Sequence, residues 1–216
     1  MAETRKPSIA VLGASGGVGR RVVARALDRG FDVVCQTRDA KKLADLAARV
    51  RVLVFDPRDA GKLEDFVAGA NAVIFALGVD TFGATTLFSE VTATLIAAMK
   101  KARVKRLIAI TGVGAGETRG RGGFLYDRVI FPLFTRNSYA DKNRQEALIA
   151  ASDLDWIIVR PASFTNSALA GPIEVHTSVA PGTVLRRVTR DEVAAFVVEQ
   201  IDGDRYLRQR PFIGHP

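Results

Sequence analysis

The segment SIAVLGASGGVGRRVVARALDRG, residues 8–30, decides the fold of this chain. Its first five residues are a mostly apolar run with β-branched Ile9 and Val11, which predicts a strand, and residues 17–29 have the periodicity of a helix. Between them Gly13, Gly16 and Gly19 are spaced three residues apart. A strand, a glycine-rich turn and a helix in this order predict the first βα unit of an α/β protein.

The three glycines suit a loop that binds phosphate. Gly13 permits a tight turn, Gly16 lets backbone amides approach a diphosphate, and Gly19 lets the helix pack closely on the strand. The N-terminus of the following helix adds unpaired N–H groups and a partial positive charge. An ordinary tight turn is the alternative, but the strand before the loop and the helix after it favour dinucleotide binding.

The rest of the chain repeats this alternation. Five further apolar runs predict strands at residues 32–37, 51–55, 72–76, 105–110 and 155–159. Helical periodicity occupies residues 40–48, 61–68, 85–102 and 140–151. The longest of these helices is expected to bury one face, made of Leu87, Val91, Thr94, Leu95, Ala98 and Met99. Continuous apolar strands suit a parallel sheet covered on both faces, so we predict a doubly wound α/β Rossmann fold in a single domain, residues 1–216.

Two segments interrupt the alternation. Residues 112–138 are rich first in glycine and arginine and then in aromatic residues, which predicts a lid or an interface insert. Residues 164–187 are predicted to form a small C-terminal annex on the substrate side, with strands at 173–177 and 183–187. Residues 189–192, TRDE, predict a capping box that opens a final helix. His215, beside the C-terminus, is expected to be disordered.

Composition limits the classes of partner. The 216 residues include 31 Lys and Arg against 23 Asp and Glu, and the net charge of +8 favours anionic ligands. The arginines are scattered and no nucleic-acid motif accompanies them, so we expect no nucleic-acid partner. With one cysteine and two histidines, we predict no metal site. Without a signal peptide or an apolar run of roughly 18 residues, the chain is predicted to be cytoplasmic, away from membranes, as a monomer or homodimer.

The second predicted strand indicates which dinucleotide is bound. An NAD site carries Asp or Glu about 20 residues beyond the glycines, to bind the ribose 2′-hydroxyl. This chain has Arg38 there, followed by Lys41 and Lys42, while Asp39 is suited to capping the next helix. A guanidinium can bind a 2′-phosphate through two hydrogen bonds. A solvated, basic helix start is the alternative, and we predict NADP, with NADPH preferred over NADH.

Other candidate residues follow the predicted strands, at the edge where open α/β sheets bind ligands. Asp56, followed by Pro57, is placed either to accept a hydrogen bond from the adenine amine or simply to form a turn. The next strand leads into Ala76, Leu77 and Gly78, which we expect beside the adenosine ribose and the diphosphate. Thr111 ends the fifth strand, where its hydroxyl either bonds the nicotinamide amide or a substrate carbonyl, or has no special role.

The glycine loop, the segment DKNRQE at residues 141–146 and the segment VRP at 159–161 together resemble the atypical short-chain dehydrogenase/reductases. Within them the chain is similar to the NAD(P)H-binding, NmrA-like group that includes flavin reductase/biliverdin reductase B, over essentially its whole length. The resemblance implies that Arg38 binds the 2′-phosphate and that Lys142 reaches the nicotinamide ribose. It implies diphosphate binding by Gly13, Ala14, Ser15, Gly16, Gly17 and Val18. It also implies that the nicotinamide is flanked by Thr111, Pro161, Ala162, Ser163 and Phe164.

The chain departs from this family in its catalytic motif. Typical members use Tyr-x-x-x-Lys, and no tyrosine here has a lysine four residues later. Tyr139 lies three residues before Lys142, just ahead of the predicted helix, so Tyr139, Lys142 and Thr111 are the catalytic candidates. Without a dedicated acid, carbonyl reduction is hard, whereas flavins and quinones demand less of the protein. We therefore predict an NADPH-dependent reductase of a planar acceptor such as a flavin or quinone; the alternative is a non-catalytic NADP(H)-binding redox sensor.

Overall fold

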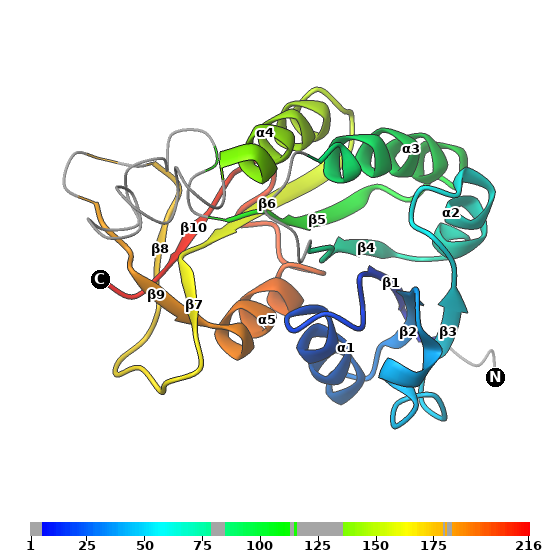
Figure 1. The fold of residues 1–216 in the computed structure, drawn as a ribbon, viewed down its shortest axis with the longest axis horizontal. Coiled ribbons are helices and arrows are strands. Elements are labelled where there is room, and N and C mark those ends of the chain that lie inside the picture. The colour runs from blue at the N-terminus through cyan, green and yellow to red at the C-terminus, as the bar shows by residue number, and fades with distance from the viewer. Residues whose placement is uncertain (1–5, 79–84, 113–114, 116–135, 179, 181–182) are drawn as a thin grey trace.

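An eight-stranded sheet with helices on both faces forms the body of the structure (Figure 1). In this computed structural model the described residues are 6–78, 85–112, 115, 136–178, 180 and 183–216, and for residues 136–139 the backbone alone. Six strands correspond to the predicted ones: β1 (Ser8–Leu12), β2 (Asp32–Thr37), β3 (Arg51–Val54), β4 (Ala72–Phe75), β5 (Arg106–Ile110) and β6 (Asp155–Pro161). They pair in parallel in the order β3-β2-β1-β4-β5-β6. The doubly wound α/β fold is therefore confirmed.

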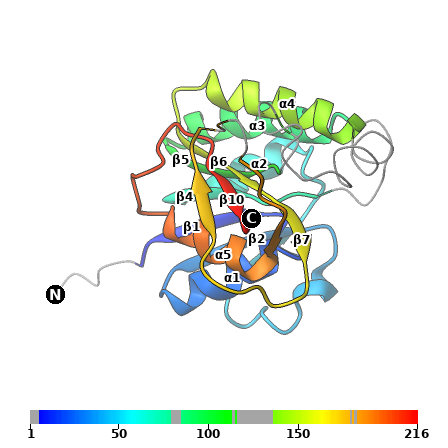
Figure 2. The ribbon, with the colours of Figure 1, turned by 90° about the vertical axis from the view of Figure 1, so that its left-hand side faces the viewer.

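The strand order changes direction between β1 and β4, where open α/β sheets bind ligands beyond the carboxyl ends of the strands. The helices are α1 (Gly19–Asp28), α2 (Ala60–Val67), α3 (Leu87–Lys101), α4 (Arg136–Ala150) and α5 (Arg190–Glu199). Figure 1 and Figure 2 both show α1 and α5 on one face of the sheet and α3 and α4 on the other.

Each face of the sheet has its own apolar core, because side chains alternate along a strand. Ile9 and Val11 of β1 belong to the cluster packed under α1 and α5, and Ala10 and Leu12 belong to the cluster on the opposite face. Cys35 of β2 is fully buried, and burial raises the pKa of its thiol to about 12, as befits an inert core residue.

Two helical predictions need correction. The predicted helix at residues 40–48 is a short 3₁₀ helix, Ala40–Leu43, followed by turns; Asp39 caps it by accepting from the Lys41 amide at 3.0 Å. The Arg20 side chain donates to the Lys42 carbonyl at 2.7 Å and so holds this connection tightly. In α3, Phe88 and Thr92 are buried in place of Leu87 and Thr94, because α4 also packs on this helix.

The C-terminal part of the chain contains more strands than the two that the sequence predicted. Beyond β6, the main sheet gains β10 (Phe212–Gly214), parallel to β6, and β8 (Glu174–His176), antiparallel to β10. A separate two-stranded sheet pairs β7 (Ser163–Thr165) with β9 (Arg187–Thr189), so the strand predicted at 183–187 begins only at its last residue. Figure 1 shows β7, β8 and β9 at the left-hand end of the molecule, and Figure 2 views the molecule from that end.

The expected disorder of His215 is wrong, and the capping box predicted at residues 189–192 is confirmed. His215 is not disordered: it is buried, and its Nε2 lies 2.9 Å from a Glu192 carboxylate oxygen. The predicted capping box forms, since Thr189 and Glu192 bond reciprocally at the start of α5. The proposed lid or insert, residues 112–138, lies mostly outside the described residues. Helix α4 begins at Arg136, so the backbone of Tyr139 lies within the helix rather than ahead of it.

Candidate functional site

A cleft of about 510 Å³ lies along the carboxyl ends of the parallel strands. It brings together most of the site residues predicted from the sequence: Gly13, Ser15, Gly16, Gly17, Val18, Arg38, Lys42, Asp56, Pro57, Ala76, Leu77, Gly78, Thr111, Lys142 and Phe164. Four predicted residues do not line it: Ala14, Pro161 and Ala162 are buried, and the Ser163 hydroxyl oxygen is also buried. The side chain of Tyr139 lies outside the described residues.

The glycine loop is shaped by close backbone approaches. Gly13 has a φ of +83°, and a Cβ on it would lie 2.8 Å from the carbonyl oxygen of Ala76 at the end of β4. A Cβ on Gly19 would lie 2.2 Å from the Gly13 carbonyl oxygen. Both positions exclude every residue with a side chain, so β1, β4 and the start of α1 can meet here only through glycine.

The backbone amides of the glycine loop also suit a diphosphate, because several of them have no acceptor within the described part of the chain. The amides of Ala14 and Gly16 donate within the protein, each at 3.0 Å, to carbonyl oxygens of Gln36 and Gly13. The amides of Ser15, Gly17 and Val18 have no acceptor in the described part of the chain. Val18 is the N-cap of α1 and makes no side-chain capping bond. Since the Arg20 amide already donates to the Gly16 carbonyl oxygen at 2.9 Å, the amides of Ser15, Gly17 and Val18 are the ones available to an anion.

Gly13→Ala is expected to abolish measurable dinucleotide binding and to lower the free energy of unfolding by more than the ~1–2 kcal/mol that a left-handed backbone costs alanine. The excess comes from the overlap with Ala76. Gly30→Ala is the matched control, because Gly30 also has a φ of +83° but a Cβ there meets nothing within 4 Å. Urea unfolding and NADPH titration of both variants check this; equal losses of stability would contradict it.

One end of the cleft is basic. Arg38 and Lys42 line it, and Arg58, which the sequence analysis did not single out, joins them from the turn after β3. Arg58 pairs with Glu90 at 2.9 Å, so part of its charge is already compensated. The Asp56 carboxylate accepts from the Arg58 amide at 2.9 Å and also lines the cleft. Both roles considered for Asp56 are thus compatible with its position.

Gln36 connects this end to the glycine loop. Its buried side chain accepts from the Gly13 amide at 3.0 Å and donates to the Phe55 carbonyl at 2.8 Å. It therefore holds β1, β2 and the residue after β3 in register at the site. Sequence reasoning missed Gln36, although a glutamine inside an apolar strand run is a signal that a buried polar group has a specific partner.

The opposite end of the cleft carries a buried ionic network. Thr111 donates its hydroxyl hydrogen to Glu146 at 2.8 Å, so this hydroxyl is left only as an acceptor for a ligand. Glu146 also accepts from Arg160, from Nε at 3.1 Å and from Nη2 at 2.6 Å. Neither Glu146 nor Arg160 was singled out from the sequence, although Glu146 stands four residues, one helical turn, after Lys142.

Lys142 lies at the edge of this network. Its Nζ donates to the Thr111 carbonyl oxygen at 2.5 Å. Burial lowers the pKa of Lys142 to about 8, and the charge of Glu146 opposes this shift. The preceding residue, Asp141, is buried and caps α3 by accepting from the Phe88 amide at 2.8 Å. Asp141 thereby fixes α4 against α3 and keeps Lys142 at the cleft.

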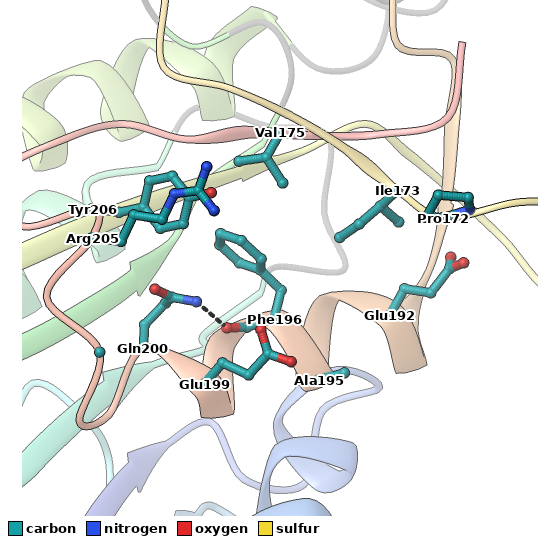
Figure 3. A pocket seen from close by; sticks show the side chains of 11 residues that line it. Pro172, Ile173, Val175, Glu192, Ala195, Phe196, Glu199, Gln200, Arg205 and Tyr206 are labelled. Carbon is teal, nitrogen blue, oxygen red and sulfur yellow. Dashed lines mark hydrogen bonds between the residues drawn. The ribbon is translucent and has the colours of Figure 1, made fainter.

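A second hollow of about 620 Å³ is larger but chemically less suited to a dinucleotide (Figure 3). It lies between the outer face of α5 and the residues around β8, with Phe196, Tyr206 and Val175 facing one another. Its lining contains no residue of the glycine loop, and the carboxylates of Glu192 and Glu199 would repel a diphosphate. The cleft at the sheet edge is therefore the candidate site.

Two further findings concern other classes of site. Among the residues that the structure describes, no three His, Cys, Asp or Glu side chains are grouped so as to hold a metal ion. Within the same part of the chain, none of the helices is both long and apolar enough to cross a membrane. The cytoplasmic location stays a prediction.

A parallel sheet whose glycine loop and open helix N-terminus meet at the change of strand order defines a Rossmann-type dinucleotide-binding protein. A family model described as NAD(P)H-binding matches residues 13–204. The chain thus belongs to this NAD(P)H-binding family, and it shares its fold with a short-chain dehydrogenase/reductase.

Relatives of the chain differ in their described roles. The chain is 26% identical over 217 residues to the photosystem II assembly factor Ycf39 of Synechocystis sp., covering 95% of this chain and 62% of that protein. It is 26% identical over 202 residues to the uncharacterized sugar epimerase YhfK of Bacillus subtilis, with coverages of 89% and 86%. The chain thus spans less than two thirds of the length of the first of these.

Solved structures share the fold. A short-chain dehydrogenase/reductase of Veillonella parvula in complex with NADP superposes with a TM-score of 0.80 at 18% identity, covering 97% of this chain and 95% of that one. A Rossmann-fold NAD(P)-binding family protein of Shigella flexneri superposes with a TM-score of 0.76 at 23% identity, with coverages of 98% and 95%.

Proposed function

We propose that this protein is an NADPH-dependent reductase of a planar acceptor such as a flavin or a quinone. The observation that carries the proposal is one continuous cleft with three parts: the glycine loop in its middle, Arg38 and Lys42 at one end, and Lys142 with the Phe164 ring at the other. Such a cleft matches a dinucleotide with an extra phosphate at its adenosine end and a reactive ring at the other.

The basic end supports NADPH rather than NADH. No carboxylate follows the end of β2 at the position of Arg38, where an NAD site places one to bind the ribose 2′-hydroxyl. The Arg38 guanidinium can bind a 2′-phosphate through two hydrogen bonds, and Lys42 adds a second positive charge on the same side of the cleft.

The other end supports reduction of an acceptor whose product needs little acid catalysis. When bound, the cofactor supplies a hydride from its nicotinamide ring. Lys142 places a positive charge, with a proton at Nζ, at that end of the cleft, where it stabilises an anionic product. The Phe164 ring is 42% exposed and lines the same cleft, with the Arg190 guanidinium 4.9 Å from its centre, so its exposed apolar part is available to a planar acceptor. The protein acts as a monomer or homodimer in this proposal.

Arg38→Ala is expected to weaken NADPH binding about tenfold to a hundredfold, because one charge-assisted hydrogen bond is worth roughly 1.5 to 3 kcal/mol. NADH binding should hardly change, since NADH lacks the 2′-phosphate. Isothermal titration with both cofactors measures this. An equal loss of affinity for NADPH and NADH would mean that Arg38 does not bind the 2′-phosphate.

The proposed activity is tested by turnover of purified protein with NADPH and FMN, riboflavin or a soluble quinone. Oxidation of NADPH that saturates in both substrates would support a reductase. Tight NADPH binding without turnover of any acceptor on the panel would instead favour the NmrA-type redox sensor. One relative of the chain is named as an assembly factor and another as an uncharacterized epimerase.

A further inference from the structure

Arg190, the first residue of α5, reaches from the C-terminal annex to the glycine loop. Its side chain lines the cleft and crosses directly over Gly17. A Cβ on Gly17 would lie 2.9 Å from Cδ and 3.0 Å from Nε of Arg190. The aliphatic part of Arg190 therefore lies in van der Waals contact with the loop, which brings the guanidinium to the Gly17 side of the cleft.

The guanidinium is held in place by neutral partners. Its Cζ lies 4.9 Å from the centre of the Phe164 ring, and its Nη1 donates to Oδ1 of Asn166 at 3.0 Å. The capping box between Thr189 and Glu192 fixes the backbone at the start of the helix. Because the side chain is already ordered, little conformational entropy is lost when it binds an anion.

The charge of Arg190 is not compensated by an ion pair in the part of the chain that the structure describes. Arg25, on the adjacent helix, forms an ion pair with Asp191, and Arg58 in the cleft pairs with Glu90. Among the residues that the structure describes, no carboxylate forms an ion pair with Arg190. A half-buried cation without a counter-ion, in contact with a phosphate-binding type of loop, is suited to an anionic ligand.

The distribution of cations along the cleft indicates which part of the ligand this is. Arg38, Lys42 and Arg58 follow β2 and β3 at the adenosine end, and Lys142 lies beyond β5 at the other end. Arg190 lies between these groups, against the loop whose free amides suit a diphosphate. A diphosphate carries two negative charges, and helix N-termini supply only about half a unit of positive charge.

We propose that Arg190 binds the bridging diphosphate of the cofactor, so that the C-terminal annex contributes a phosphate-binding group to the site. This inference rests on the proposed dinucleotide function and adds a second cationic determinant, distinct from Arg38. Arg190 recognises the part shared by NADPH and NADH, whereas Arg38 recognises the part that differs between them.

The test measures the equilibrium binding of NADPH, NADH and adenosine 2′-monophosphate by calorimetry. Where adenosine 2′-monophosphate binds too weakly for direct titration, its affinity is measured by competition with NADPH. Arg190→Ala is expected to weaken NADPH and NADH by the same factor, about tenfold to a hundredfold, and to leave adenosine 2′-monophosphate unchanged. Arg38→Ala should show the opposite pattern, with NADPH and adenosine 2′-monophosphate weakened and NADH unchanged. Arg190→Lys keeps the charge but loses the paired hydrogen bonds of the guanidinium. Its affinity for both dinucleotides should lie between those of the wild type and Arg190→Ala.

Arg186→Ala is the matched control, because Arg186 is an exposed arginine of the same annex that does not line the cleft. It removes the same charge and should change no affinity. Thermal unfolding of each variant verifies folding. Wild-type affinity in Arg190→Ala, or a loss confined to NADPH, would overturn the inference while leaving the reductase proposal intact. Wild-type protein that binds neither dinucleotide would instead overturn the proposed function itself.

Discussion

Glu146→Ala is expected to lower the free energy of unfolding by ~3–5 kcal/mol, the usual cost of removing one partner from a buried ion pair. Arg160 is 2% exposed and Glu146 5% exposed, so the variant leaves a guanidinium buried without its counter-ion. Thr111 loses its acceptor at the same time. For a chain of this length, each kcal/mol shifts the melting temperature by roughly 2–4 °C, and differential scanning calorimetry should record a drop of about 6–20 °C.

Two comparisons isolate the buried pair as the cause. Glu64 forms an exposed ion pair with Lys101, and Glu64→Ala should hardly change the melting temperature, because surface pairs contribute little. The double variant Glu146→Leu, Arg160→Met should recover most of the stability, since apolar replacement of a whole buried pair is often neutral. If Glu146→Ala lowered the melting temperature as little as Glu64→Ala, the buried pair of Glu146 and Arg160 would not stabilise the fold as proposed.

The parts of the site that could be predicted from sequence are those set by local geometry. Gly13, Gly16 and Gly19 lie between a predicted strand and a predicted helix, and Arg38 directly follows the next predicted strand, so this short segment predicts a dinucleotide site. The parts that could not be predicted depend on tertiary contacts. Arg190 meets Gly17 from a distant segment, and Glu146 meets Arg160 from a helix onto a strand.

The same distinction explains the errors in the fold. The periodicity of residues 40–48 is typical of a helix, but Arg20 bonds the Lys42 carbonyl and the segment closes as a 3₁₀ turn. The short strand β10 has no alternation to recognise, and it exists because β6 and β8 pair with its two edges. His215 is ordered for the same reason, since its backbone bonds Arg187 and its ring contacts Glu192.

Lys142 should give the reductase a characteristic pH dependence. With a pKa of about 8 set by burial, its ammonium is present at pH 7 and is lost as the pH rises past 8. Turnover with a quinone or flavin should therefore fall above pH 8. Lys142→Met should lose about a hundredfold in kcat at pH 7, the usual cost of removing one group that stabilises an anionic product, and should show no decline in that range. Lys142→Arg keeps its charge and should also lack the decline.

Protein stability offers a second readout of the same group, independent of catalysis. A lysine whose pKa is lowered from 10.5 to about 8 in the folded protein binds fewer protons there than in the unfolded chain between these values. Its contribution to the free energy of unfolding therefore rises with pH across this window. The difference in stability between Lys142→Met and wild type should shift in favour of wild type from pH 7.5 to pH 10. A constant difference across that range would mean that Lys142 titrates as an ordinary exposed lysine and cannot supply a proton near neutral pH.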